Sequence, residues 1–142
     1  MKQNIVERKI MWGDLDALGI VFYPRYYEWI DACAHLFFEK IKLNMGMLWS
    51  ERNILFGLAE TSCRYLRPAR YNQSIRIVTE IDALKEKNLV LKHNIHAITD
   101  DTLMVEGYEN RICLDVSDPK DFKAMDIPED IYTILENAKR GV

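Results

Sequence analysis

Residues 13–42 read GDLDALGIVFYPRYYEWIDACAHLFFEKIK, and this stretch decides the fold. From Pro24 to about Lys42, large apolar side chains recur at spacings of three and four, which is the period of an α-helix. Pro24 suits the first helical position, because its missing N–H costs nothing there and its φ is already close to the helical value. The apolar stripe is wide. We therefore expect a helix over residues 24–42 that the rest of the chain largely encloses.

The remainder of the chain is predominantly strand-like. Five segments favour β-branched, aromatic or alternating residues: 4–12, 54–68, 74–84, 89–99 and 103–116. Short turn sequences separate the last four, which predicts antiparallel neighbours. A short helix around Met45–Arg52 and an amphipathic C-terminal helix over about 128–140 complete the pattern. We expect an α+β fold in a single domain spanning 1–142.

Composition narrows the class of protein. The chain has 142 residues, 49% of them hydrophobic and 29% charged, as in ordinary globular domains. Its net charge of −3 gives no electrostatic support for binding nucleic acid. The N-terminus has charges within every apolar run and is neither a secretory signal nor a membrane span. Three cysteines without CxxC spacing indicate reduced thiols rather than a zinc site. We therefore expect a cytoplasmic protein without a membrane partner.

The loop of residues 13–23 carries the chemistry. It places Asp16 beside glycines and shortly before the expected helix, whose first turn offers unpaired backbone N–H groups. A carboxylate opposite such donors could attack a carbonyl or activate a water, while the donors stabilise the oxyanion. Two alternatives stay open from the residues alone. Aspartate in such a loop commonly forms an Asx-turn or caps a helix, and Asp14 competes with Asp16 for the role.

The run D-x-x-G-I-V-x-Y-P-x-Y, from Asp16 to Tyr26, and the W-x-D-A run that ends at Ala32 resemble the active-site segment of the 4-hydroxybenzoyl-CoA thioesterase family. The resemblance implies a hotdog fold, in which an antiparallel sheet wraps around one long central helix. It also implies that Asp16 is the catalytic nucleophile or general base. The backbone amide of Tyr23 would polarise the thioester carbonyl, and Gly19 would belong to the substrate-binding residues.

The resemblance suggests further substrate-binding residues. Asp31, in the W-x-D-A run, would accept a hydrogen bond from a polar acyl group, or else it pairs with a neighbouring base. Lys85 and Lys87 occupy a turn at which the family carries a nucleotide-binding basic cluster, although Glu86 between them departs from that pattern.

Other basic and aromatic residues admit simpler interpretations. Arg64, Arg67 and Arg70 could bind phosphate or could serve as a charged sheet edge that discourages aggregation. For three aromatic residues, core packing is a better interpretation than a place in the acyl pocket: Trp49, Phe56 and Tyr65.

Histidines and cysteines offer no second catalytic centre. His93 and His96 are three apart in one strand and so face opposite sides of the sheet. His35 has no recognisable acidic partner in the sequence, and we interpret it as a core or interface residue. Cys33 and Cys63 lack a recognisable base and are interpreted as inert buried thiols.

These expectations combine into one function. We predict that the chain hydrolyses an acyl-CoA, preferably with an aromatic or short branched acyl group, without a metal or other cofactor. Two alternatives remain: a thioesterase acting on acyl carrier protein, and a non-catalytic acyl-CoA-binding module. The resemblance implies a homodimer or homotetramer with active sites at the subunit interface.

Overall fold

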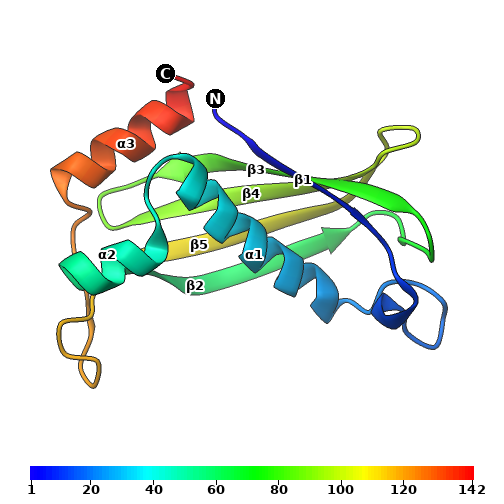
Figure 1. Cartoon of the computed structure of the whole chain (residues 1–142), viewed down its shortest axis with the longest axis horizontal. Helices are drawn as coiled ribbons and strands as arrows, with labels where there is room; N and C mark the ends of the chain where they lie inside the picture. The colour runs from blue at the N-terminus through cyan, green and yellow to red at the C-terminus, as the bar shows by residue number, and fades with distance from the viewer.

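The strands form one antiparallel sheet in the computed structural model, which describes residues 1–142 (Figure 1). The strand order is β1-β3-β4-β5-β2, and β6 pairs with the end of β5. The strands are β1 (Asn4–Lys9), β2 (Ile54–Tyr65), β3 (Ser74–Leu84), β4 (Asn88–Ala97), β5 (Leu103–Asp115) and β6 (Lys123–Ala124). The connections β3–β4 and β4–β5 are short turns, as the sequence predicted. Strands β1 and β2 are the two edge strands of the sheet.

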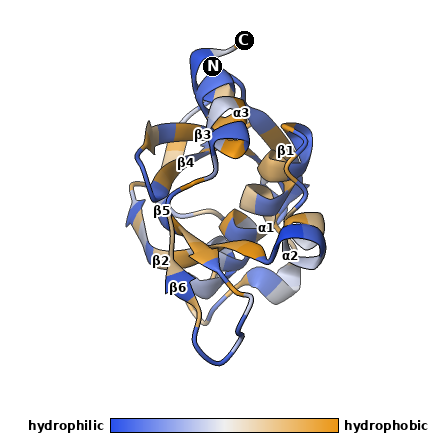
Figure 2. Cartoon of the chain, turned by 90° about the vertical axis from the view of Figure 1, so that its left-hand side faces the viewer, coloured by the Kyte–Doolittle hydropathy of each residue, from blue (hydrophilic) through white to orange (hydrophobic).

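Helix α1 (Pro24–Lys40) crosses the concave face of this sheet (Figure 1). It begins at the proline that the sequence singled out, and it buries one wide face made of Tyr26, Trp29, Ile30, Cys33, Ala34, Phe37 and Phe38. The sheet curls around this helix when the molecule is seen end-on (Figure 2). This is the hotdog fold, which confirms the predicted α+β class.

The C-terminus of α1 comes two residues earlier than the sequence suggested. Lys42 takes the left-handed conformation with φ of 69°, and the Leu43 N–H donates to the Phe38 carbonyl at 2.8 Å. This is a Schellman ending, in which the residues on either side of the turn also pack together. Glycine is usual at the left-handed position, so the lysine gave no signal in the sequence.

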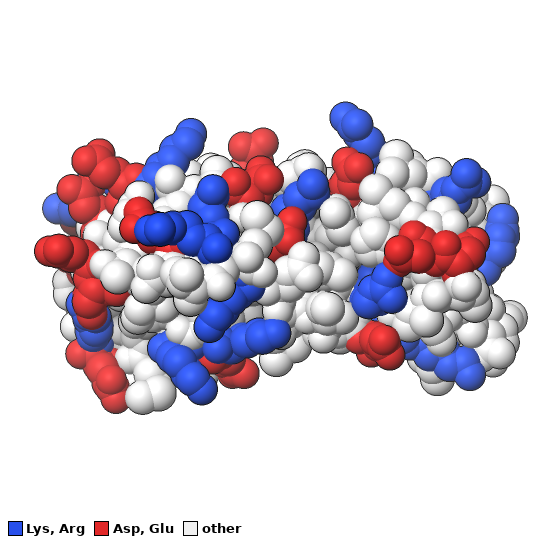
Figure 3. Space-filling model, turned by 90° about the horizontal axis from the view of Figure 1, so that it is seen from above, with Lys and Arg blue, Asp and Glu red and all other residues white.

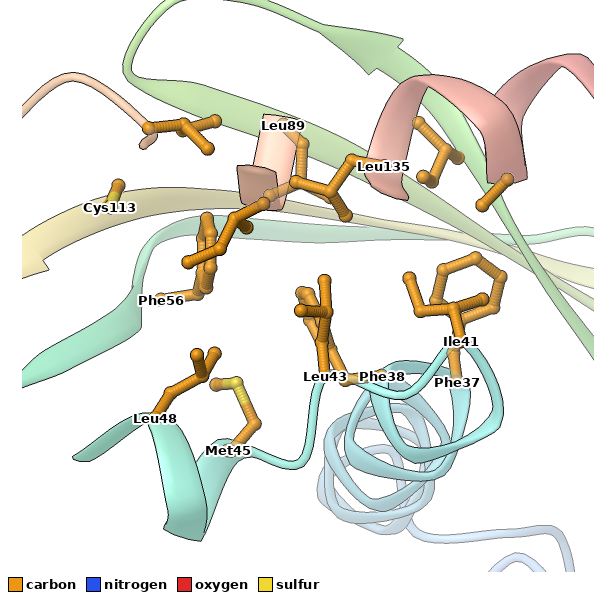
Figure 4. Close-up of a cluster of buried hydrophobic side chains, with 14 of the residues drawn as sticks. Phe37, Phe38, Ile41, Leu43, Met45, Leu48, Phe56, Leu89, Cys113 and Leu135 are labelled. Atoms are coloured by element: carbon orange, nitrogen blue, oxygen red, sulfur yellow. The ribbon is translucent and has the colours of Figure 1, made fainter. Parts of the chain in front are cut away.

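Two clusters of buried side chains form the core. One contains residues from Ala34 to Ala138, and Figure 4 shows its side chains converging from α1, helix α2 (Met45–Arg52), the sheet and helix α3 (Glu129–Arg140). Phe38 and Phe56 stack there with ring centroids 5.4 Å apart. The second cluster packs the first half of α1 against β3 and β4 through Trp29, Ile75, Ile77 and Ile95. None of the helices is long and apolar enough to cross a membrane.

Strand β1 is shorter than the expected 4–12. Residues Trp12–Asp14 form a 3₁₀ turn instead, because the Asp14 carboxylate accepts the Met11 N–H at 2.9 Å. The chain thereby leaves the sheet edge and enters the loop that leads to α1.

Candidate active site

The loop between β1 and α1 is a small tight hairpin. The Asp16 N–H donates to the Ile20 carbonyl at 2.8 Å, and the Phe22 N–H donates to the Asp14 carbonyl at 2.8 Å. Gly19 closes the tip with φ of 76°, and its N–H donates to the Asp16 carbonyl at 3.0 Å. Such a positive φ favours glycine. Gly19 therefore sets the shape of the loop, and it does not line the neighbouring cavity.

Asp16 is fixed by one of its carboxylate oxygens. Its Oδ1 accepts the Leu18 N–H at 2.8 Å, the Asx-turn that the sequence left open. Its Oδ2 has no hydrogen-bond partner in the chain. The Asx-turn and the catalytic interpretation are thus compatible, because one oxygen positions the side chain and the other remains available for chemistry.

Asp14 serves the fold rather than the site. It is buried, caps the 3₁₀ turn and lies 3.5 Å from both the Arg8 and the Arg25 guanidinium. Arg25 also donates to the Gly13 carbonyl at 3.3 Å, which ties the start of α1 to the loop. All of its interactions hold the loop in place, so the structure separates the two aspartates that the sequence could not.

The Tyr23 N–H is a free backbone donor at the start of α1. The N–H groups of Arg25 and Tyr26 already donate to the carbonyls of Phe22 and Tyr23, at 2.9 and 3.1 Å. Pro24 has no N–H. The Tyr23 N–H has no partner in the chain, so it is the amide available to an incoming oxyanion. The sequence suggested several such donors, and the structure shows that the Arg25 and Tyr26 amides are already engaged.

Asp16 and Tyr23 line the same cavity. Its volume is about 450 Å³, and its walls come from the loop, from α1 and from the segment after β2. The lining is mostly apolar: Ile20, Val21, Tyr26, Tyr65, Leu66 and Pro68, together with Arg67. A carboxylate and a free amide donor in one apolar cavity can support addition to a thioester carbonyl.

Two tyrosines of this wall were not predicted as site residues. Tyr26 and Tyr65 have ring centroids 5.7 Å apart, and Tyr65 is 46% exposed. The core interpretation of Tyr65 and of the exposed Trp49 was therefore wrong, whereas Phe56 is in the core. Burial raises the pKa of Tyr26 to about 12, and burial together with the Tyr27 hydroxyl raises the pKa of Tyr65. Both hydroxyls stay protonated at neutral pH and are not bases.

Asp31 pairs with a basic residue, which was one of the two interpretations of this residue from the sequence. Its Oδ1 lies 2.8 Å from Arg111, a buried residue of β5 that also contacts Glu109 at 2.9 Å. Glu109 lies 2.9 Å from His93 Nε2, whose Nδ1 in turn lies 2.7 Å from Thr79 Oγ1. These residues connect α1 to the middle of the sheet. Asp31 lies outside the cavity.

The interpretation of His35 requires a correction. The sequence gave it no acidic partner, yet its Nε2 lies 3.7 Å from the Asp31 carboxylate, one helical turn away. His35 is exposed and lies outside the cavity. Burial raises the pKa of Cys33 to about 11 and also raises the pKa of Cys63, so neither is a ready thiolate. No group of three or more His, Cys, Asp or Glu side chains could hold a metal ion.

Lys85 and Lys87 lie at the β3–β4 turn, at the opposite end of the sheet from the loop (Figure 1). Strand β3 has 11 residues, which at a rise of roughly 3.3 Å per residue separates its ends by about 30 Å. Lys87 pairs with the Asp126 carboxylate at 2.9 Å. Within one subunit, these lysines therefore lie far from Asp16.

Comparison with known proteins gives consistent matches. The chain matches the thioesterase-like superfamily over residues 10–135. It is 28% identical to the 4-hydroxybenzoyl-CoA thioesterase of Pseudomonas sp. strain CBS-3, over 88% of this chain and 92% of that protein. The solved structure of that enzyme superimposes with a TM-score of 0.85 at 26% identity, covering 94% of this chain and 99% of the other. A gentisyl-coenzyme A thioesterase superimposes with a TM-score of 0.79 at 26% identity, covering 93% and 99%.

Proposed function

The chain belongs to the thioesterase-like superfamily, as the motif around Asp16 indicated, and from this premise we propose that it hydrolyses an acyl-CoA to the free acid and CoA. One observation carries the proposal. The free Oδ2 of Asp16 and the free N–H of Tyr23 line the same apolar cavity.

The chemistry follows from this pairing. A thioester carbonyl bound between the two groups would direct its oxygen to the Tyr23 N–H. Asp16 would take a proton from a water molecule, whose oxygen adds to the carbonyl carbon, or would add to that carbon itself. In either case negative charge develops on the carbonyl oxygen, where the amide stabilises it. The thiolate of CoA then leaves as the carbonyl re-forms.

The cavity wall supports an aromatic acyl group. Tyr23, Tyr26 and Tyr65 supply three rings around a space of about 450 Å³, and aromatic rings pack favourably edge-to-face or offset. The relatives compared above are named for 4-hydroxybenzoyl-CoA and gentisyl-CoA, both aromatic thioesters. We therefore propose an aryl-CoA as the preferred substrate, with short branched acyl groups next.

A hydrolysis screen tests the proposal. Release of CoA from a panel of aromatic, branched and straight-chain acyl-CoAs is measured for the wild type and for Asp16→Asn. Asparagine can still accept the Leu18 N–H, so the loop is kept while the base or nucleophile is lost. We expect turnover to fall by about 10²–10⁴-fold. Asp82→Asn, an exposed aspartate in β3, is the matched control and should hydrolyse as the wild type does. Near wild-type turnover in the Asp16 variant would refute the assignment.

We further propose a homodimer or homotetramer in the cytoplasm. Strand β2 is a free sheet edge, and five successive residues from Leu58 to Ser62 are exposed, with Leu58 at 48%. Such an edge is usually covered. The free state of all three cysteines supports a reducing compartment. A second subunit is also what Lys85 and Lys87 would need to reach bound substrate, and sedimentation velocity measures the oligomeric state directly.

A further inference from the structure

The end of β2 and the segment that follows it form one wall of the cavity and together carry three arginines. Tyr65, Leu66, Arg67 and Pro68 line the cavity. Leu66 and Arg67 donate their N–H groups to the Met104 carbonyl, at 2.8 and 3.1 Å. Further along the same segment, Arg70 forms an antiparallel β-bridge with Ile20 of the β1–α1 loop. The backbone of this wall is therefore held in place on both sides.

The three arginines of this wall are not engaged in ion pairs. Arg64, Arg67 and Arg70 are all exposed, and none of them forms an ion pair. By contrast, five other arginines each pair with a carboxylate: Arg8, Arg25, Arg52, Arg76 and Arg111. The chain as a whole carries a net charge of −3, and on the face seen in Figure 3 acidic and basic side chains are interspersed. Three arginines without an ion-pair partner thus lie close together in the sequence of this wall. Hydrogen bonds from Thr102 and, to a lesser extent, the charge of Arg67 lower the pKa of the neighbouring Asp100.

A charged sheet edge does not account for these residues. Strand β2 ends at Tyr65, so Arg67 and Arg70 lie beyond the strand and cannot protect its edge from pairing. Only Arg64 fits that interpretation.

The lining of the site changes from apolar to polar at Arg67. Arg67 and Pro68 line a second hollow of about 350 Å³, whose other walls include Gln73, Asp100 and Thr102. The Asp100 carboxylate there accepts the Thr102 N–H at 3.1 Å. The apolar cavity that holds Asp16 therefore adjoins a polar hollow, and Arg67 and Pro68 line both. A pantetheine thioester has the same order, with an apolar acyl group, an amide-containing arm and then phosphate.

We propose that Arg64, Arg67 and Arg70 form a phosphate-binding rim that holds the phosphorylated end of the pantetheine thioester, with Arg67 nearest the reacting group. The inference rests on the proposed hydrolysis of a pantetheine thioester and adds the residues that recognise its charged end. Guanidinium groups suit this task, because they present several N–H donors to phosphate oxygens in a fixed fork. The same phosphate chemistry occurs in CoA and in the prosthetic group of a carrier protein.

Kinetics on three benzoyl thioesters test the rim: the esters of CoA, of phosphopantetheine and of pantetheine. For Arg67→Ala, and for the variant with all three arginines changed to alanine, we expect the ratio of kcat/KM for benzoyl-CoA to that for benzoyl-pantetheine to fall about 10-fold or more, mainly through KM. Arg140→Ala is the matched control, since Arg140 lacks an acidic partner but lies at the end of α3. A ratio that keeps its wild-type value in the triple variant would overturn the rim.

The phosphopantetheine ester identifies the source of the phosphate. If the arginine variants already lose kcat/KM with the phosphopantetheine ester, relative to the pantetheine ester, the rim binds the phosphate that CoA and carrier proteins share. A loss that appears only with CoA assigns it to the nucleotide. Either result supports the rim.

Binding of CoA itself, measured by calorimetry, separates this inference from the proposed function. If the wild type binds CoA about 10-fold more tightly than the triple variant, the rim stands even where no thioester is hydrolysed. Equal affinities for CoA would overturn it even in an active thioesterase. The same titration with Lys85→Ala and Lys87→Ala measures what the β3–β4 turn adds.

Discussion

The Tyr23 backbone amide can be removed with little damage to the fold, and this makes it the sharpest test of the site. Tyr23 has φ of −54°, within the range that a proline ring imposes, and its N–H has no partner in the chain. Tyr23→Pro therefore deletes the proposed oxyanion donor without breaking a hydrogen bond. The ring that is lost is 58% exposed and contacts the Phe22 ring at a centroid distance of 5.6 Å.

The expected loss can be estimated from the number of donors. The Arg25 and Tyr26 amides are already bonded and Pro24 has none, so none of these three residues can replace the lost donor. Removal of one oxyanion donor typically costs about 2.7–4 kcal/mol, or about 10²–10³-fold in kcat. We expect this loss in kcat for an aryl-CoA in stopped-flow or steady-state assays, with a much smaller change in KM.

Tyr23→Ala is the control, because it removes the same ring but keeps the N–H. Proline also restricts the residue before it, so urea unfolding of both variants must show that the loop and α1 remain folded. If the proline variant is folded and its kcat matches that of the alanine variant, the amide is not the oxyanion donor and the proposed geometry is wrong.

Three further changes test the interactions that hold the site. Asp14→Ala should lower the free energy of unfolding in urea by about 1–3 kcal/mol, because the buried Asp14 carboxylate no longer accepts the Met11 N–H. Asp16→Asn should change it by less than about 0.5 kcal/mol, and the reverse order would contradict the roles given to the two aspartates. Arg111→Ala should lower the free energy of unfolding by about 3–5 kcal/mol, since it leaves the Glu109 carboxylate buried without its arginine, with only His93 beside it. A loss below about 1 kcal/mol would show that the network is not stabilising. The pKa of Tyr26 is raised from 10.0 to about 12, so the unfolded chain releases this proton first and the stabilisation present below pH 10 is lost as the pH rises towards 12. Between about pH 10 and pH 12, the free energy of unfolding of Tyr26→Phe should fall by about 2–3 kcal/mol less than that of the wild type, as measured by urea or thermal unfolding. An equal fall in the two proteins would disprove the raised pKa of Tyr26.

Local sequence was sufficient to predict the helices and strands and to find the motif around Asp16. The period of three and four after Pro24 predicted α1, and the strand-like segments became β1 to β5. The errors fell at element ends, where single hydrogen bonds decide the outcome. The Lys42 turn shortened α1, and the Asp14 cap took residues 10–12 out of the first strand.

The walls of the site could not be read from the sequence in the same way. Tyr65 ends β2 and Arg67 follows it, some fifty residues after Asp16. They reach the cavity because the segment after β2 pairs with the β1–α1 loop at Ile20 and Val21. A tyrosine that packs in a core and a tyrosine that lines a cavity have the same local pattern. The sequence therefore assigned Tyr65 to the wrong environment.

The sequence by itself determined the central helix, the antiparallel strands and the presence of an acidic loop before a helix start, because these features depend on neighbours a few residues apart. Only the tertiary structure decided which aspartate is available, which amide is free and which bases meet the acids. Asp31 and Arg111 are 80 residues apart and form an ion pair at 2.8 Å because α1 packs across β5. Burial and long-range pairing consume some polar groups and leave others unsatisfied, and the unsatisfied groups in the cavity make up the candidate site.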